Sequence, residues 1–307
     1  MFARGFVCSH PHPQPASRTE SPNSNYSSTC RGNNIVDESN YVMEYFSGGQ
    51  LCLRHGCAPE ERLLLMFQSY FDESEDGGTI VVSGWAASAK EWLVFEGEWS
   101  EYLTRNGIDA FHMNEFGKNG KHYHAWGDNP KRYCDFLLEG AAIIKRHVNF
   151  GISRGIFLKE YNEADRQCEI KSKIGPAFSV CGLLVTCRAQ KRGVSGGFKA
   201  ENVRHYFDDP GRGKGKPELT KLFEDFLRGS PQFEDGRERK KPKQIQAADF
   251  LAWEHRFTLQ QYLEFGPLDT EQIHRSLRSL NGIPNDSQML AGVENIVAFC
   301  HNPRSLC

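Results

Sequence analysis

Residues 63–86 decide the fold, and they read Leu63-Leu-Leu-Met-Phe-Gln-Ser-Tyr-Phe71, then Asp72-Glu-Ser-Glu-Asp-Gly-Gly78, then Thr79-Ile-Val-Val-Ser-Gly-Trp-Ala86. The first and third stretches are rich in the aromatic, aliphatic and β-branched residues that favour strands. The acids and paired glycines between them are typical of a turn. The pattern therefore predicts an antiparallel hairpin whose turn spans residues 72–78.

The elements after the hairpin alternate between helices and strands. Large apolar residues recur at helical spacing until Gly107 ends the pattern: Trp92, Phe95, Trp99, Tyr102 and Leu103. A short extended piece is expected over residues 109–116. A helix is then predicted to begin at Asn129-Pro130. Further helices are predicted over 176–193, 217–227 and 245–263, strands over 148–158 and 203–208, and weaker helices over 269–280 and 287–299. This order predicts an α/β domain over residues 61–307, with a mixed sheet flanked by helices.

Residues 1–60 have a different composition from the rest of the chain. They are rich in serine, asparagine and proline, as in Ser21-Pro-Asn-Ser-Asn-Tyr-Ser-Ser28, and show little periodicity. Such segments rarely bury enough apolar surface to fold. We expect a disordered or non-native extension, and Met66, just before the strand, is a candidate for the natural start.

Composition excludes several classes of protein. The formal net charge is −2, so nucleic-acid binding would need a local basic patch rather than a global attraction. The ten cysteines include no C-x-x-C pair, which argues against a disulfide framework and a thiolate zinc site, so reduced thiols are expected. No window approaches the roughly 18 apolar residues of a membrane span, and no signal-peptide core is present. These features predict a cytoplasmic protein without a membrane partner.

The segment Gln246-Ala-Ala-Asp249 places an acid among small and apolar residues. On helical spacing, Asp249 shares a face with Ile245, Ala248 and Ala252. A buried carboxylate is costly unless it is paired, protonated or bound to a cation. Asp249 is thus a candidate cation ligand, and the alternatives are a salt bridge to an arginine or a cap to another helix.

Two further acidic pairs, Asp72-Glu73 and Asp208-Asp209, follow hydrophobic strands. Acids are common at such turns, but two strand-terminal acids combined with an acid on a helix face form a less ordinary set. Mg²⁺ prefers oxygen ligands, and Mg²⁺ or Mn²⁺ ions held by carboxylates from separate elements can activate water against a phosphodiester. The acids therefore predict a metal cluster.

Four segments together resemble a known bacterial family: Tyr70-Phe-Asp-Glu-Ser74, Phe111-His-Met-Asn-Glu-Phe116, Tyr206-Phe-Asp208 and Gln246-Ala-Ala-Asp-Phe-Leu-Ala252. The family is called domain of unknown function 3800, and it is similar to the ribonuclease H-like superfamily. The resemblance covers roughly Met66 to the end and implies a ribonuclease H-like mixed sheet flanked by helices. The metal ligands that it implies are Asp72, Asp208 and Asp249, with Glu115 or Glu73 as additions. Where many members have glycine after Asp-Glu-Ser, this chain has Glu75.

Histidines offer a proton carrier or a second metal site. His112 stands three residues before Glu115 and changes charge near neutral pH, so it is a candidate catalytic proton carrier. The alternative is a hydrogen-bonded histidine at a strand edge. His122 and His124 lie on one side of an extended segment, and with His112 they leave a zinc hydrolase open as an alternative.

Two basic runs adjoin the acids. The first contains Arg212, Lys214 and Lys216 and follows the strand that ends at Asp208. The second, residues 237–243, precedes the Asp249 helix, and its candidate contacts are Arg239, Lys240, Lys241 and Lys243. Charge runs are usually solvated loops, but a phosphate backbone would pass beside the metal ligands, so we expect these residues to contact nucleic acid.

The sequence thus favours a divalent-metal-dependent nuclease acting on RNA or DNA, with Asp72, Glu115, Asp208, Asp249 and His112 in catalytic roles. The alternative is a non-catalytic module of the same fold that binds nucleic acid or protein in a defence or mobile-element system. This second hypothesis rests on fold analogy.

Overall fold

The computed structural model describes residues 66–117, 129–211, 215–227, 231–234, 241–266, 268 and 275–303, with the paired strands β1 (Glu44–Tyr45) and β2 (Leu51–Cys52). Apart from β1 and β2, the extension expected over residues 1–60 lies outside this described part. Whether the natural chain starts at Met66 stays a prediction.

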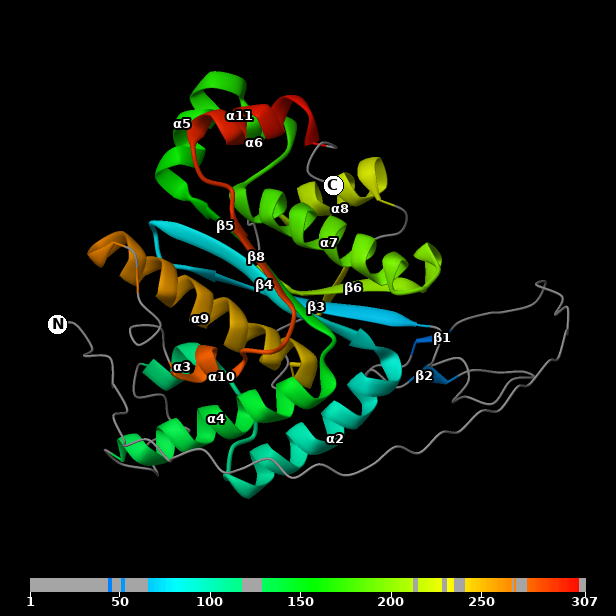
Figure 1. The fold of residues 1–307 in the computed structure, drawn as a ribbon. Helices are drawn as coiled ribbons and strands as arrows, with labels where there is room; N and C mark the ends of the chain where they lie inside the picture. Colours follow the sequence, from blue (N-terminus) through cyan, green and yellow to red (C-terminus); the bar gives the residue numbers. More distant parts are fainter. Residues whose placement is uncertain are drawn as a thin grey trace, which may run out of the picture.

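A six-stranded mixed sheet forms the centre of the molecule, in the order β7-β6-β3-β4-β5-β8 (Figure 1). Its strands are β3 (Phe67–Glu75), β4 (Thr79–Ser88), β5 (Phe150–Phe157), β6 (Val203–Asp208), β7 (Gln232–Glu234) and β8 (Asn285–Met289). Strands β3, β4 and β5 are antiparallel neighbours, whereas β6 is parallel to β3, β7 to β6 and β8 to β5. The α/β class with a mixed sheet is confirmed.

The hairpin is confirmed, but its predicted turn over residues 72–78 is too long. Strand β3 continues through Asp72, which pairs with Ser83, to Glu75. Residues 76–78 are enough to reverse the chain, because the Asp76 carboxylate accepts the backbone N–H of both Gly78 and Thr79. Asp72 is therefore an internal strand residue and not a turn residue.

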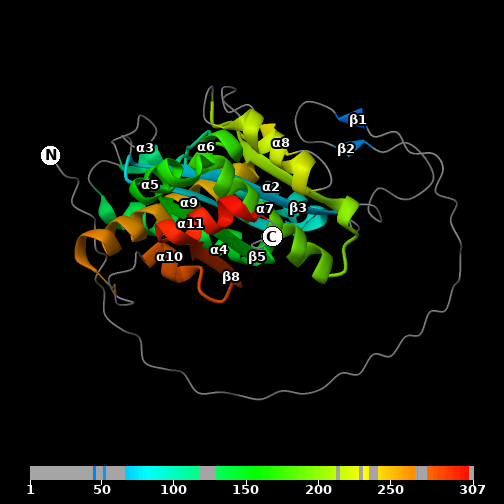
Figure 2. The same ribbon diagram turned by 90° about the horizontal axis from the view of Figure 1, so that it is seen from above.

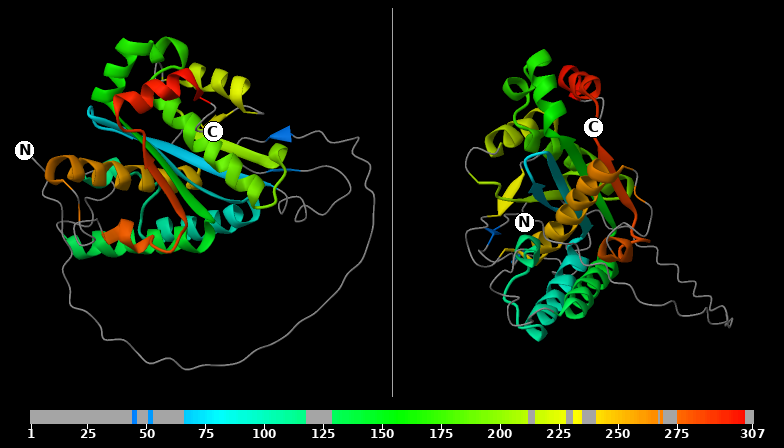
Figure 3. Two further views of the ribbon diagram at one scale, coloured as in Figure 1. Left: turned by 45° about the horizontal axis from the view of Figure 1, so that its top comes forward. Right: turned by 90° about the vertical axis from the view of Figure 1, so that its left-hand side faces the viewer.

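Helices cover both faces of the sheet (Figures 1 and 2). One face carries α5 (Leu158–Cys168), α6 (Ile170–Lys173), α7 (Ala177–Ser195), α8 (Lys216–Phe226) and α11 (Val293–His301). The other face carries α2 (Ala89–Arg105), α3 (Met113–Gly117), α4 (Pro130–His147), α9 (Lys243–Phe265) and α10 (Arg275–Ser279). A short 3₁₀ helix, η2 (Ala200–Asn202), precedes β6. The result is a three-layer arrangement with an apolar core on each side of the sheet (Figure 3).

Local signals located the long helices correctly. The aromatic stripe from Trp92 to Leu103 is buried on α2. Asn129 caps α4 by accepting the backbone N–H of Arg132, with Pro130 in the first turn. Helix α9 also matches its predicted range, and residues 244–252 are buried between the sheet and the α2–α4 layer.

Other predicted elements are wrong. The piece expected to be extended over 109–116 ends in helix α3. The helix expected over 287–299 is divided between strand β8 and helix α11. The helix expected over 269–280 is borne out in its described part as α10, and residues 269–274 lie outside the described residues. Helices α5 and α6 and strand β7 were not predicted.

Strand β8 is fixed to the sheet by charge rather than by apolar side chains. Its Asp286 forms a buried ion pair with Arg154 of β5 at 3.0 Å, and Arg154 also donates to the Asp286 carbonyl at 2.7 Å. Arg188 of α7 pairs with the same carboxylate. This polar anchoring explains why the sequence of β8 lacks a strand-like apolar pattern.

The structure also bears on the expected thiol states and on the expected absence of a membrane-spanning helix. Cys134, Cys168, Cys181 and Cys300 are free thiols, whereas Cys187 is disulfide-bonded, so the expectation of reduced thiols is wrong for Cys187. Among the described residues, no helix combines the length and apolar content that crossing a membrane requires.

Candidate functional site

Asp72 and Asp208 lie side by side on neighbouring strands. Phe71 of β3 pairs with Phe207 of β6 in parallel register, so the acid that follows each phenylalanine projects toward the α9 face. Both carboxylates are nearly inaccessible, at 5% exposure for Asp72 and 8% for Asp208. Asp72 Oδ1 accepts the backbone N–H of Glu73 at 2.8 Å. The sheet therefore brings together two acids that stand 136 positions apart, the difference between 208 and 72.

Asp249 joins them from helix α9, which packs across β3 and β4. Its Oδ2 accepts the backbone N–H of Met113 at 2.8 Å and lies 3.1 Å from His112 Nδ1. Within the described residues Asp249 forms no salt bridge to an arginine, whereas its bond to the first backbone N–H of α3 matches the alternative of a cap to another helix. Asp249 raises the pKa of His112, which favours the imidazolium form. Asp249 thus holds the 112–113 segment against the site.

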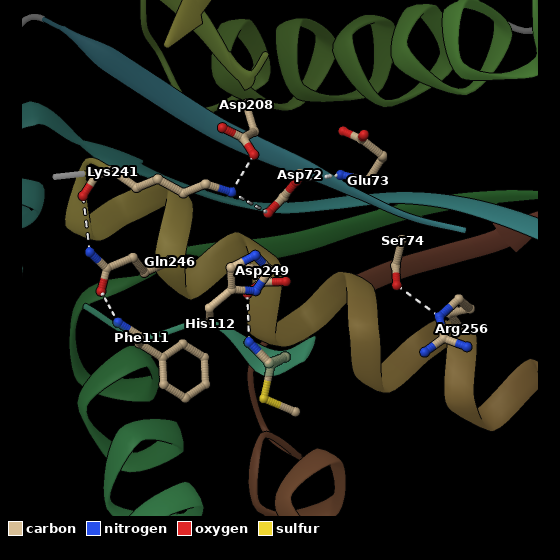
Figure 4. Close-up of polar contacts among 11 residues, drawn as sticks. Asp72, Glu73, Ser74, Phe111, His112, Asp208, Lys241, Gln246, Asp249 and Arg256 are labelled. Carbon is tan, nitrogen blue, oxygen red and sulfur yellow. Dashed lines mark hydrogen bonds and ion pairs between the residues drawn. The ribbon is translucent and has the colours of Figure 1, made fainter. Parts of the chain in front are cut away.

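Lys241 provides a positive charge between Asp208 and Asp72 (Figure 4). Its ammonium contacts Asp208 Oδ2 and lies 3.9 Å from Asp72 Oδ2. Burial acts to lower the pKa of Lys241, but the carboxylates of Asp72, Asp208 and Asp249 outweigh it and raise this pKa. The lysine therefore remains charged in its buried position.

The pKa values of Asp72 and Asp208 remain raised despite this cation. Burial raises the pKa of Asp72 well above its ordinary value; Asp249 and Asp208 raise it further, and Lys241 opposes them. Burial likewise raises the pKa of Asp208. Asp208 Oδ1 is buried, and within the described part of the chain it has no hydrogen-bond partner. Such perturbed, incompletely satisfied carboxylates are typical of functional sites.

The remaining predicted acids lie at the margin of this cluster. Glu73 projects from β3 away from Lys241 (Figure 4), and its charge acts on Asp72. Glu115 lies on α3, and its charge helps to raise the pKa of His112. Glu234 of β7, which the sequence did not suggest, is paired in register with Asp208, and burial and Asp208 both raise its pKa.

The carboxylate oxygens of Asp72, Asp208 and Asp249 are the type of ligand that the hard divalent cations Mg²⁺ and Mn²⁺ prefer. The arrangement does not suit one: in the described ranges, no group of three or more His, Cys, Asp or Glu side chains is placed to hold a metal ion. Lys241 instead provides a positive charge among Asp72, Asp208 and Asp249.

The predicted nucleic-acid contacts are described only in part. Lys216 Nζ lies 3.0 Å from Asp209 Oδ2 and 4.8 Å from the centre of the Phe233 ring. Lys241 belongs to the acid cluster, and Lys243 begins α9. The other predicted contacts and the two zinc candidates lie outside the described residues: Arg212, Lys214, Arg239, Lys240, His122 and His124.

The sequence did not reveal how Lys241 is held. Gln246, only 1% exposed, donates from Nε2 to the Lys241 carbonyl at 2.9 Å. Its Oε1 accepts the backbone N–H of Phe111 at 2.9 Å and the indole N–H of Trp99 at 3.1 Å. A polar residue in the buried stripe of α9 was the available signal, because a buried amide needs hydrogen-bond partners.

Comparison with known proteins identified no relative. No protein-family model matches the chain, and no curated protein is detectably similar to it in sequence.

Proposed function

We propose that this protein is a divalent-metal-dependent nuclease with a ribonuclease H-like fold, which hydrolyses phosphodiester bonds of RNA or DNA at Asp72, Asp208 and Asp249. The observation that carries the proposal is that these three buried carboxylates come from separate elements, that Asp72 and Asp208 lie beside the ammonium of Lys241, and that all three raise its pKa. Burying several carboxylates is unfavourable for folding, and proteins retain such clusters mainly where a cation is used.

The sheet supports the fold assignment. Three consecutive strands, β3, β4 and β5, are antiparallel, and β6 and β7 then continue the sheet in parallel on the other side of β3. This is the order that the resemblance to ribonuclease H-like proteins leads us to expect. The acids also occupy expected places: the first strand, the end of the strand parallel to it, and a later helix.

Bound Mg²⁺ or Mn²⁺ would supply Lewis acidity and a metal-activated water for phosphodiester hydrolysis. Asp72, Asp208 and Asp249 are the residues that would hold the cation, and in this structure the Lys241 ammonium lies at Asp72 and Asp208 instead. His112 would hold a proton beside Asp249, since its side chain is 38% exposed and Asp249 favours its protonated form.

The test is cleavage of labelled single- and double-stranded RNA and DNA by the purified full chain, with Mg²⁺ or Mn²⁺ and with EDTA. We expect cleavage only with metal. Asp249→Asn should lower the rate by roughly a hundredfold or more, because even residues that only support metal ligands are worth about 10–100-fold. An asparagine oxygen can still accept the Met113 N–H, so the fold should survive.

Asp135→Asn is the matched control, because Asp135 is an exposed acid of α4 paired with Lys131. It should cleave at the wild-type rate. Metal-independent cleavage, or full activity of folded Asp249→Asn, would exclude the proposed mechanism.

A second function is favoured by the position of Lys241. Because an internal ammonium already lies among the acids, the domain can be charge-compensated without metal, as in a non-catalytic nucleic-acid-binding module. This alternative predicts no cleavage and nucleic-acid binding that EDTA does not alter. Calorimetric titration with Mn²⁺ separates the two, since only the nuclease should bind the ion.

A further inference from the structure

Three arginines converge on the carboxylate of Asp286 in strand β8. Arg154 of β5 approaches one oxygen, with its Nη2 at 3.0 Å from Asp286 Oδ1. Two arginines of α7 approach the other oxygen: Arg188 pairs with Oδ2, and Arg192 Nη2 lies 3.5 Å from it. Arg188 and Arg192 are one helical turn apart and therefore share one face of α7. The sheet and the helix thus present their cations to the same point.

This arginine cluster carries an excess of positive charge. In the described part of the chain, all three arginines pair with Asp286, and none of them forms an ion pair with another acid. Guanidinium groups stay charged in proteins, so a single carboxylate offsets one of the three and leaves two in excess. Burial lowers the pKa of Arg154 and the charge of Arg188 lowers it further, while Asp286 opposes both effects. The arginines therefore repel one another, and Asp286 does not neutralise them.

Most hydrogen-bond donors of the two α7 arginines are unused. Within the described residues, Arg188 donates only through Nε, to Asp286, and Arg192 donates no hydrogen bond. The Arg188 side chain is 37% exposed and that of Arg192 is 30% exposed, so their free N–H groups can reach a molecule in solution. The Phe150 ring lies 5.1 Å from Arg192 Cζ, and this cation–π contact helps to hold the guanidinium beside the cluster.

These features match a phosphate group. Guanidinium groups bind phosphate oxygens through paired N–H donors, and arginine is favoured where such planar recognition is needed. A phosphate monoester carries a charge of about −1.5 to −2 at neutral pH, and its oxygens are strong hydrogen-bond acceptors. It can therefore offset the excess charge and accept from the free donors together, whereas a carboxylate can offset the charge only in part.

We propose that Arg188 and Arg192 form a phosphate-binding site beside strand β8, with Asp286 anchoring it to the sheet. The site lies on the face of the sheet that carries α7, whereas Asp72 and Asp208 project toward α9. It therefore does not depend on the proposed nuclease activity. Free phosphate and a nucleic-acid backbone present the same chemistry to these arginines, and the experiment distinguishes the two sources.

The test is calorimetric titration of the full chain with inorganic phosphate, at an ionic strength held constant with sodium chloride. Wild type should bind phosphate, and Arg192→Gln should bind it roughly tenfold more weakly, because charge-assisted hydrogen bonds are lost. This variant should fold, since Arg192 donates no hydrogen bond within the described residues. Arg166→Gln is the matched control, because Arg166 is an exposed arginine of α5 paired with Glu163. It should change the phosphate affinity by less than about twofold, since solvated charges are screened.

Fluorescence anisotropy with a labelled single-stranded oligothymidine identifies the source of the phosphate. If the site holds a nucleic-acid backbone, Arg192→Gln should weaken binding of the oligonucleotide, and inorganic phosphate should compete with it. If the site holds free phosphate, Arg192→Gln should weaken phosphate binding alone and leave binding of the oligonucleotide as in wild type. Either result supports the site.

A measurement on wild type removes the dependence on the variant's folding. Modification of arginines by phenylglyoxal, mapped by mass spectrometry, should slow severalfold at Arg188 and Arg192 in saturating phosphate and stay constant at Arg166. Three results would overturn the site: no phosphate binding by wild type, wild-type phosphate affinity in folded Arg192→Gln, or unchanged reactivity of both α7 arginines in saturating phosphate.

Discussion

Replacing Gln246 by leucine tests whether the buried amide network holds the site together. The substitution nearly conserves side-chain volume, so little of its effect comes from an empty cavity. It removes three hydrogen bonds: those with the Trp99 indole, the Phe111 backbone N–H and the Lys241 carbonyl. These partners then lie at a site where the side chain is only 1% exposed, which leaves little access for replacement water.

The expected destabilisation follows from these lost bonds. A net contribution of about 1 kcal/mol for each hydrogen bond gives a loss of about 3 kcal/mol in the free energy of unfolding. Buried partners left unsatisfied raise the cost further. This is a large part of the roughly 5–15 kcal/mol that stabilises an ordinary domain.

Urea unfolding followed by tryptophan fluorescence and far-ultraviolet circular dichroism measures this loss, provided that the m value is unchanged. Gln261→Leu is the matched control, because Gln261 lies near the end of the same helix at a partly exposed position. It should change the free energy by less than about 0.5 kcal/mol. A loss below about 1 kcal/mol for Gln246→Leu would refute the claim that this network organises the site.

Three further predictions concern charge and packing. Because the pKa of Asp72 is raised in the folded state, that state binds more protons than the unfolded one and loses stability as pH rises above the ordinary value of 3.8. Asp72→Asn should therefore be more stable than wild type at pH 7 and equal to it near pH 3; lower stability at pH 7 would show that the carboxylate is a net stabilising partner. The Gly84→Ala variant should fail to fold, or its free energy of unfolding should fall by about 3 kcal/mol or more. The added Cβ would lie 1.9 Å from the Tyr70 carbonyl oxygen. A wild-type melting temperature would contradict this packing. Arg154→Met should cost about 1–3 kcal/mol, because Asp286 loses its 3.0 Å partner and the bond to its carbonyl but keeps its ion pair with Arg188. Chemical denaturation measures this loss, and a change below about 0.5 kcal/mol would mean that the pair is dispensable.

Local sequence patterns were sufficient for the elements that carry their own signals. The apolar runs around Gly77-Gly78 specified the β3–β4 hairpin, the aromatic stripe specified α2, and Asn129-Pro130 marked the start of α4. Each prediction depends on residues close in sequence, whose periodicity and capping chemistry act before any tertiary contact forms. The same reasoning placed Asp249 on a buried helix face.

The short edge strands required the tertiary structure. Strand β8 has a polar sequence and exists because β5 offers a free edge and Arg154 pairs with Asp286. Strand β7 spans only residues 232–234 and is held by its pairing with β6. In such elements, hydrogen bonds and ion pairs to distant residues outweigh intrinsic propensity.

For the site, the sequence by itself placed Asp208 at the end of a strand and Asp249 on a buried helix face, but it assigned Asp72 to a turn. Only the tertiary structure decided that Asp72 and Asp208 lie beside Lys241, a residue that the sequence assigned to a basic loop, and that Asp249 is close enough to raise its pKa. The physical reason is that the interaction between two charges depends on their distance in space and on their burial. Charges far apart in sequence can therefore compensate one another as strongly as neighbours do.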